Sequence, residues 1–134
     1  MLTMSQHDWF AWHSPYDDPR SVLSRRLAMV RARLAEDLDG CRPGRVQVVS
    51  MCAGQGRDIL GVLARHPRAG DVVARLVESD PHNVALARQG AAPFAGVESV
   101  EADAGCTWVA PRRAFPRLVV FVGHVGACGF RIVA

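Results

Sequence analysis

A short apolar strand that leads directly into a glycine-rich turn is the feature of this sequence that most limits its fold. Val46–Met51 is rich in β-branched residues, which is typical of a strand that is covered on both faces. Residues 52–56 (Cys-Ala-Gly-Gln-Gly) follow it, and apolar residues then recur at helical spacing from Asp58 to Arg65. Strand, glycine turn and helix in this order predict one unit of a parallel α/β sheet.

The remaining segments alternate in the same way. A helix is expected to begin with Asp18 as its N-cap and Pro19 in its first turn, and to end near Gly40. A further helix is expected to begin with Asp80 as its N-cap and Pro81 in its first position, and to end near Gly90. Further strands are predicted at Val72–Glu78, Val97–Glu101 and Leu118–Val122. The predicted fold class is therefore α/β, a Rossmann-like parallel sheet with flanking helices on both faces.

Two acidic residues follow the predicted strands at spacings that suggest a ligand. Gly54 and Gly56 by themselves fit a tight turn with no ligand as well as they fit a binding loop. Glu78 ends the second strand, 22 residues after Gly56, which is where dinucleotide-type folds place the acid that binds ribose hydroxyls. Asp103 follows the third strand, 25 residues after Glu78. Because ligands bind at the carboxyl ends of parallel strands, the glycine loop and Glu78 predict a site for a ribose-containing ligand, with Asp103 at the same edge of the sheet.

These segments resemble three motifs of class I S-adenosylmethionine-dependent methyltransferases. Residues 48–56 resemble the glycine motif of that family, residues 78–81 its acidic motif, and residues 102–104 the motif after its third strand. The resemblance covers about residues 20–105, and the variant Cys-Ala-Gly-Gln-Gly-Arg-Asp looks most like bacterial methyltransferase-domain proteins. It implies a methyltransferase, or its cofactor-binding half, with S-adenosylmethionine as cofactor and methyl donor.

The resemblance also implies a role for individual residues. Ala53, Gly54 and Gly56 would line the methionine moiety, and Gln55 would add a polar contact. The other implied contacts are Glu78 with the ribose hydroxyls, Ser79 beside the adenine face, Asp103 with the adenine amino group and the Ala104 backbone with a ring nitrogen. Ser50 stands where the family has an acid, and Cys52 where it has its first glycine, so a polar contact is lost and the turn is harder to build.

The competing cofactor is NAD, whose fingerprint requires a third glycine three residues after the second. This chain has Ile59 there, and Gly61 comes two residues later, which argues against NAD. No catalytic residue is assigned. Trp12, His13 and Tyr16 could cover the cofactor or touch the acceptor, and His124 follows the fourth strand, but packing or solvation is the preferred interpretation of these residues.

Composition limits the partners. The four cysteines form no Cys-x-x-Cys pair, which argues against a zinc site, and the absence of a secretory signal argues against disulfides. The formal net charge is +3, and all 16 basic residues are scattered arginines, so a nucleic-acid partner is unsupported. No apolar run is long enough for a membrane span, and a cytoplasmic location is expected.

The C-terminal part fits the pattern least well. All 13 acidic residues lie at or before Asp103, and the chain ends near a fourth strand, whereas class I methyltransferases have seven. We expect one partial domain: an aromatic segment (1–19), a cofactor-binding core (20–104) and a divergent, truncated or out-of-frame tail (105–134). Its sheet would have an exposed edge that favours self-association. A remnant that binds the cofactor without turnover is the alternative function, and the methyl acceptor is unknown.

Overall fold

The computed structural model describes residue 8, residues 10–103, residues 118–124 and residues 127–133. Within these residues the sheet has the order β3-β2-β1-β4-β5. Its strands are β1 (Val46–Met51), β2 (Val72–Glu78), β3 (Val97–Glu101), β4 (Leu118–His124) and β5 (Ala127–Val133). The pairs β1–β2, β2–β3 and β1–β4 are parallel, and β5 pairs with β4 in the antiparallel direction. The Rossmann-like parallel sheet is therefore confirmed.

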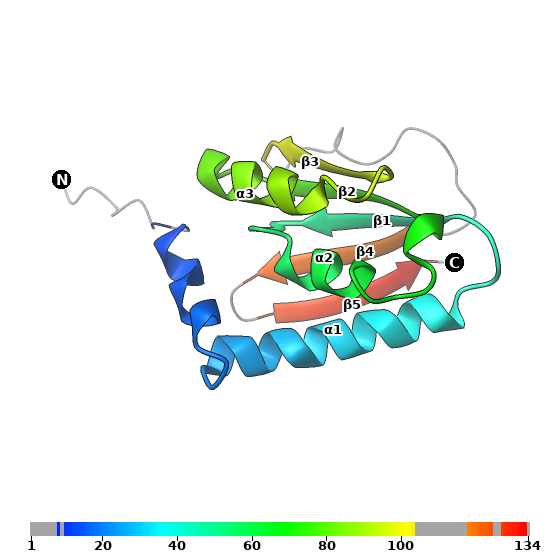
Figure 1. Cartoon of the computed structure of the whole chain (residues 1–134), viewed down its shortest axis with the longest axis horizontal. Coiled ribbons are helices and arrows are strands. Elements are labelled where there is room, and N and C mark those ends of the chain that lie inside the picture. Colours follow the sequence, from blue (N-terminus) through cyan, green and yellow to red (C-terminus); the bar gives the residue numbers. More distant parts are fainter. Residues whose placement is uncertain (1–7, 9, 104–117, 125–126, 134) are drawn as a thin grey trace.

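The strand order gives this sheet a point at which the chain reverses its direction of travel across it. From the central strand β1 the chain moves outward to β2 and β3, and then returns to β4 on the other side of β1. At such a switch point the loops that follow neighbouring strands separate and leave a crevice at their carboxyl ends. The glycine loop follows β1 and therefore lies at this point (Figure 1).

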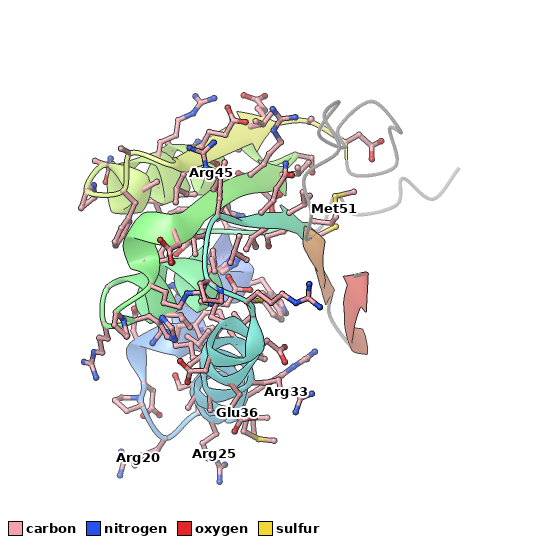
Figure 2. All side chains as sticks on the ribbon, turned by 90° about the vertical axis from the view of Figure 1, so that its right-hand side faces the viewer. Arg20, Arg25, Arg33, Glu36, Arg45 and Met51 are labelled. Atoms are coloured by element: carbon pink, nitrogen blue, oxygen red, sulfur yellow. The ribbon has the colours of Figure 1, made fainter. Side chains whose placement is uncertain are left out.

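Three helices pack against one face of the sheet: α1 (Val22–Gly40), α2 (Arg57–Leu63) and α3 (Pro81–Ala91). A single core cluster joins them to alternate residues of the central strands. Its members include Leu34, Leu38, Val46, Val48, Ile59, Leu63, Ala74, Leu76 and Ala87. The outer surface of α1 carries charged side chains beside the exposed Val22 and Met29, and Figure 2 shows Arg25, Arg33 and Glu36 pointing away from the molecule. The expectation of helices on both faces is thus met on one face by the described residues.

The predicted start of the first helix is wrong. A 3-10 helix, η1 (Ala11–Asp17), precedes α1, and the N-cap of α1 is Ser21 rather than Asp18. The Ser21 hydroxyl accepts a hydrogen bond from the Ser24 backbone N–H at 3.0 Å. The Asp18 carboxylate instead accepts from the Arg20 N–H at 2.9 Å, within the turn that links η1 to α1. Asp80, by contrast, caps α3 as predicted.

The C-terminal part contains one strand more than predicted. β4 continues to His124, so this residue belongs to the strand and does not follow it. β5 then pairs along the whole of β4, from Leu118–Val133 to His124–Ala127. The outer edge expected at the fourth strand is consequently occupied, and β5 is the edge strand on that side of the sheet.

Candidate functional site

The glycine loop is a tight turn built from three residues with positive φ. Cys52, Gly54 and Gly56 have φ values of 52°, 58° and 71°. The Ala53 N–H donates to the Val77 carbonyl at 2.9 Å, which fastens the loop to the end of β2. Residues other than glycine adopt such positive φ values at a cost of about 1–2 kcal/mol. Cys52 therefore carries backbone strain at the position where a glycine was expected.

Glu78 holds the loop from the neighbouring strand. Its side chain is only 8% exposed, and Oε2 accepts a hydrogen bond from the Gly54 N–H at 2.6 Å. Oε1 accepts from the N–H groups of Ser79 and Asp80 at 2.9 and 3.0 Å. Three backbone donors thus fix the carboxylate at the carboxyl end of β2. Sequence spacing predicted its place beside the loop, but not that it would bind the loop itself.

Asp103 lies near the same point, at the end of β3. The Ala102 N–H donates to the Glu78 carbonyl at 2.9 Å, which joins the ends of the two strands. Burial raises the pKa of the Cys52 thiol, and the carboxylates of Glu78 and Asp103 raise it further. The Cys52 thiol therefore interacts electrostatically with both carboxylates. Ser79 and Asp103 are exposed, and Ala104 lies outside the described residues.

Both ends of the Gln55 amide bind protein groups. Its Nε2 donates to Asn83 Oδ1 at 3.2 Å, and its Oε1 accepts from Arg57 Nε at 3.0 Å. Asn83 is fully buried at the start of α3, so the Gln55 amide ties the loop to that helix. In this structure the amide contributes to the shape of the loop.

Two other motif positions are buried in the helix-facing layer. Ser50 is fully buried, and its hydroxyl oxygen has no hydrogen-bond partner among the described residues. Ile59, at the position of the third glycine of an NAD fingerprint, is also fully buried in the core cluster. A branched side chain there fills the space that the fingerprint glycine leaves for close helix–strand packing.

The N-terminal aromatic residues reach the glycine loop. A Cβ built on Gly54 would lie 2.5 Å from His13 Nε2, so the imidazole rests directly on this glycine. The Arg57 guanidinium lies over the Tyr16 ring at 5.1 Å from its centroid. Trp12 forms an edge contact with His13, with the ring centroids 5.3 Å apart. The side chain of His124 lies outside the described residues.

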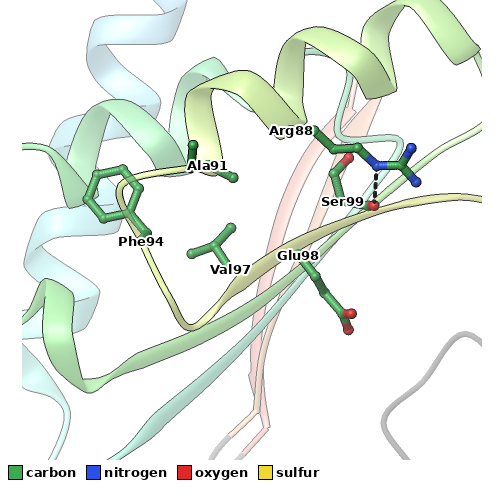
Figure 3. A pocket seen from close by; sticks show the side chains of 7 residues that line it. Arg88, Ala91, Phe94, Val97, Glu98 and Ser99 are labelled. Atoms are coloured by element: carbon green, nitrogen blue, oxygen red, sulfur yellow. Dashed lines mark hydrogen bonds between the residues drawn. The ribbon is translucent and has the colours of Figure 1, made fainter.

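A separate cavity of about 300 Å³ lies between α3 and β3 (Figure 3). It is lined by Arg88, Ala91, Ala92, Phe94, Val97, Glu98 and Ser99. Arg88 Nε donates to the Ser99 carbonyl at 3.2 Å across it. The cavity opens beside the first residues of β3, whereas the glycine loop follows the carboxyl end of β1. It contains none of the predicted site residues.

The described part of the chain also lacks a metal-binding cluster and a helix that could span a membrane. No three His, Cys, Asp or Glu side chains there are grouped so that they could hold a metal ion. None of the described helices is both long and apolar enough to cross a membrane.

No protein-family model matches the sequence, and neither does any curated protein. Solved structures do match the fold. Coclaurine N-methyltransferase bound to N-methylheliamine and SAH is 15% identical, with a TM-score of 0.52 over 77% of this chain and 29% of that one. Precorrin-6y C5,15-methyltransferase from Geobacter metallireducens GS-15 is 21% identical, with a TM-score of 0.50 over 73% of this chain and 49% of that one.

The chain therefore has a class I methyltransferase-like fold. At these identities the likeness defines the fold alone. The chain spans less than half the length of either protein.

Proposed function

We propose that the chain binds S-adenosylmethionine at the carboxyl ends of β1, β2 and β3 and takes part in methyl transfer to a small-molecule acceptor. The observation that carries this proposal is the buried Glu78 carboxylate, fixed beside the glycine loop by its bond to the Gly54 N–H. The likeness to methyltransferase structures, one of them bound to SAH, supports the choice of an adenosyl ligand. We also propose a cytoplasmic location.

The acceptor capacity of Glu78 limits how it would hold a ribose. An ionised carboxylate has about four acceptor positions, and three here receive backbone N–H groups. One ribose hydroxyl fits the remaining position. A bond to the second hydroxyl would require one of the three N–H groups to leave the carboxylate. Where the Gly54 N–H leaves Oε2, binding would be coupled to a small movement of the loop.

Other residues would complete the adenosyl site. The methionine moiety would lie along the backbone of Ala53, Gly54 and Gly56. The adenine would lie beside Ser79, Asp103 and Ala104. Gln55 would act through the loop, because both ends of its amide already bind protein groups. When bound, S-adenosylmethionine supplies a methyl group on a sulfonium, and the chain's part is to position it and exclude water.

Calorimetric titration with S-adenosylmethionine and S-adenosylhomocysteine tests the assignment of Glu78. Replacing Glu78 by Ala should weaken binding by about 1–3 kcal/mol, because the hydroxyl contact is lost. Glu78→Gln should weaken it in the same direction while keeping the side-chain volume. Glu98→Gln is the control. Glu98 lies in the first half of β3, and its half-exposed carboxylate pairs with Arg75 of β2. Equal affinities in all four proteins would refute the ribose assignment.

Formation of S-adenosylhomocysteine from S-adenosylmethionine, with panels of small amine and hydroxyl acceptors, separates an enzyme from a chain that only binds. Cofactor binding without product formation over the whole panel would favour the second candidate, a non-catalytic methyltransferase-like remnant.

A further inference from the structure

The helix η1 lies across the loop that the proposed ligand needs. Figure 1 shows η1, in blue, beside the end of the sheet to which β1 points. The His13 imidazole is packed so closely on Gly54 that a single added carbon would lie 2.5 Å from Nε2. A ligand atom that approaches Gly54 from the side of this added carbon would occupy the space of the imidazole. On that side of the glycine, His13 and a ligand exclude each other.

We propose that η1 is a self-blocking strap, and that His13 must leave Gly54 before an adenosyl ligand can bind. The inference rests on the proposed function for the identity of the ligand. It goes further by making access to the site depend on a conformational change in this chain's own N-terminal segment.

The strap is attached to α1 at its C-terminal end. The Ser21 hydroxyl, which caps α1, donates to the Pro15 carbonyl at 2.7 Å. The Ser24 hydroxyl adds a longer bond to the Tyr16 carbonyl at 3.4 Å. These bonds join the C-terminal end of η1 to the rigid start of α1.

The strap contacts exposed or half-exposed side chains in the described part of the chain. No residue of η1 is buried. Beyond His13, the closed position is held by the Tyr16 ring under Arg57 and by an Asp17–Arg57 ion pair at 3.8 Å, whose Asp17 side chain is 80% exposed. Further out, the Phe10 ring lies 5.7 Å from that of His82. Segments held by such contacts open locally without global unfolding.

With such a strap, the apparent affinity of the site is the affinity of the open form multiplied by the fraction of molecules in which the strap is open. Loosening it should therefore tighten binding. A residue that helps to hold the ligand would show the opposite result when it is removed, so the sign of the change distinguishes the two roles.

The test compares the wild-type chain with His13→Ala and Tyr16→Ala. S-adenosylhomocysteine binding is measured by calorimetry, and hydrogen exchange is followed at the Trp12 and His13 amides, which are bonded to the Asp8 and Phe10 carbonyls. Met29→Ala, at an exposed position of α1, is the control. Tyr16→Ala should speed exchange of the η1 amides by about two- to five-fold, the effect of losing an exposed cation–π contact. His13→Ala should bind at least about three-fold more tightly, because the open fraction rises. Saturating ligand should speed η1 exchange in the wild type.

Weaker binding by His13→Ala would overturn the proposal and make His13 a ligand contact. Slower η1 exchange with ligand would also overturn it, because the segment would then close over the bound molecule. If none of these proteins binds S-adenosylhomocysteine, the adenosyl assignment is wrong. The exchange rates of the η1 amides then still show whether the Tyr16 contact holds the segment closed. Unchanged exchange in Tyr16→Ala would show that the contact does not hold the segment.

Discussion

At the scale of single residues, a polar pair joins α1 to the start of α2. Arg31 reaches across from α1, and its Nε donates to the Arg57 carbonyl at 2.8 Å. Gly61 leaves room for the guanidinium, since any side chain at that position would collide with it. The Asp58 carboxylate interacts with Arg31 and accepts from the Ile59 N–H at 2.7 Å. The helix that follows the glycine loop is thus held in place by a polar contact as well as by the core.

The pH dependence of stability should reveal Asp58. Burial raises the pKa of its carboxyl, and the nearby N–H groups and Arg31 only partly oppose this. The folded chain therefore holds this proton more tightly than the unfolded chain, where the group titrates near about 3.9. The stability from this carboxyl is complete below that pH and is lost as pH rises through the folded pKa. Urea unfolding of Asp58→Asn, which cannot ionise, should show the variant gaining on the wild type from about pH 4 to pH 7.

Glu36→Gln is the control for this series, because Glu36 is exposed on α1. Its difference from the wild type should stay within about 0.5 kcal/mol, as is usual for surface substitutions. A difference for Asp58→Asn that is constant with pH, or that moves against the variant as pH rises, would show that the carboxyl is not destabilised by burial.

Residue roles were only partly predictable from the sequence. The position of Glu78 followed from strand ends and spacing, because parallel strands bring their carboxyl ends together. Its bond to the Gly54 N–H could not be predicted, because it depends on the backbone angles of the three positive-φ residues in the turn. The hydrogen bonds of Gln55 depend on Asn83, a partner 28 residues away, and no local pattern indicates them.

At the scale of elements, one arginine closes the connection between α1 and β1. Arg68 Nη1 donates to the carbonyls of Leu38 and Cys41 at 2.8 and 2.7 Å. Its Nη2 donates to the carbonyls of Arg42 and Gly44 at 2.9 and 3.0 Å. The planar, five-donor fork of arginine suits four acceptors at once. The position of β1, and with it the glycine loop, depends on this connection.

Replacing Arg68 by Lys should therefore lower the free energy of unfolding by about 1–3 kcal/mol, because several carbonyls lose their donors. Chemical denaturation measures the loss. Arg65→Lys, at an exposed position near the end of α2, should change stability by no more than about 0.5 kcal/mol. Similar small effects for both variants would mean that water replaces the Arg68 contacts at little cost.

The errors in the predicted elements have physical causes. Asp18 and Ser21 are both good caps, and the Asp-Pro pair favoured the first. The 3-10 helix η1 ends at Asp17, however, and its link to α1 occupies the Asp18 side chain. β5 was missed because Gly129 and Arg131 interrupt its apolar pattern. Two strand-like runs separated by only residues 125 and 126 were the available hairpin signal.

At the scale of the whole molecule, the two C-terminal strands belong to the same sheet as β1, β2 and β3. β4 pairs with β1 from Gln47–Leu118 to Met51–Val122, and β5 extends the sheet by one more strand. The division into a core (20–104) and a tail (105–134) remains our proposal. Self-association, also a proposal, would use the outer edge of β5 or of β3, the two edge strands of the described sheet.

The central claim is that the switch point of this sheet binds an adenosyl ligand of the methyltransferase type rather than a dinucleotide. Glu78 beside the glycine loop supports the first, and the buried Ile59 opposes the second. The most direct measurement is parallel calorimetric titration of the folded chain with S-adenosylhomocysteine and with NAD. The account predicts saturable binding of S-adenosylhomocysteine at high micromolar concentration or below, and no binding of NAD over the same range. Binding of NAD alone, or of neither ligand by a chain shown to be folded, would contradict it.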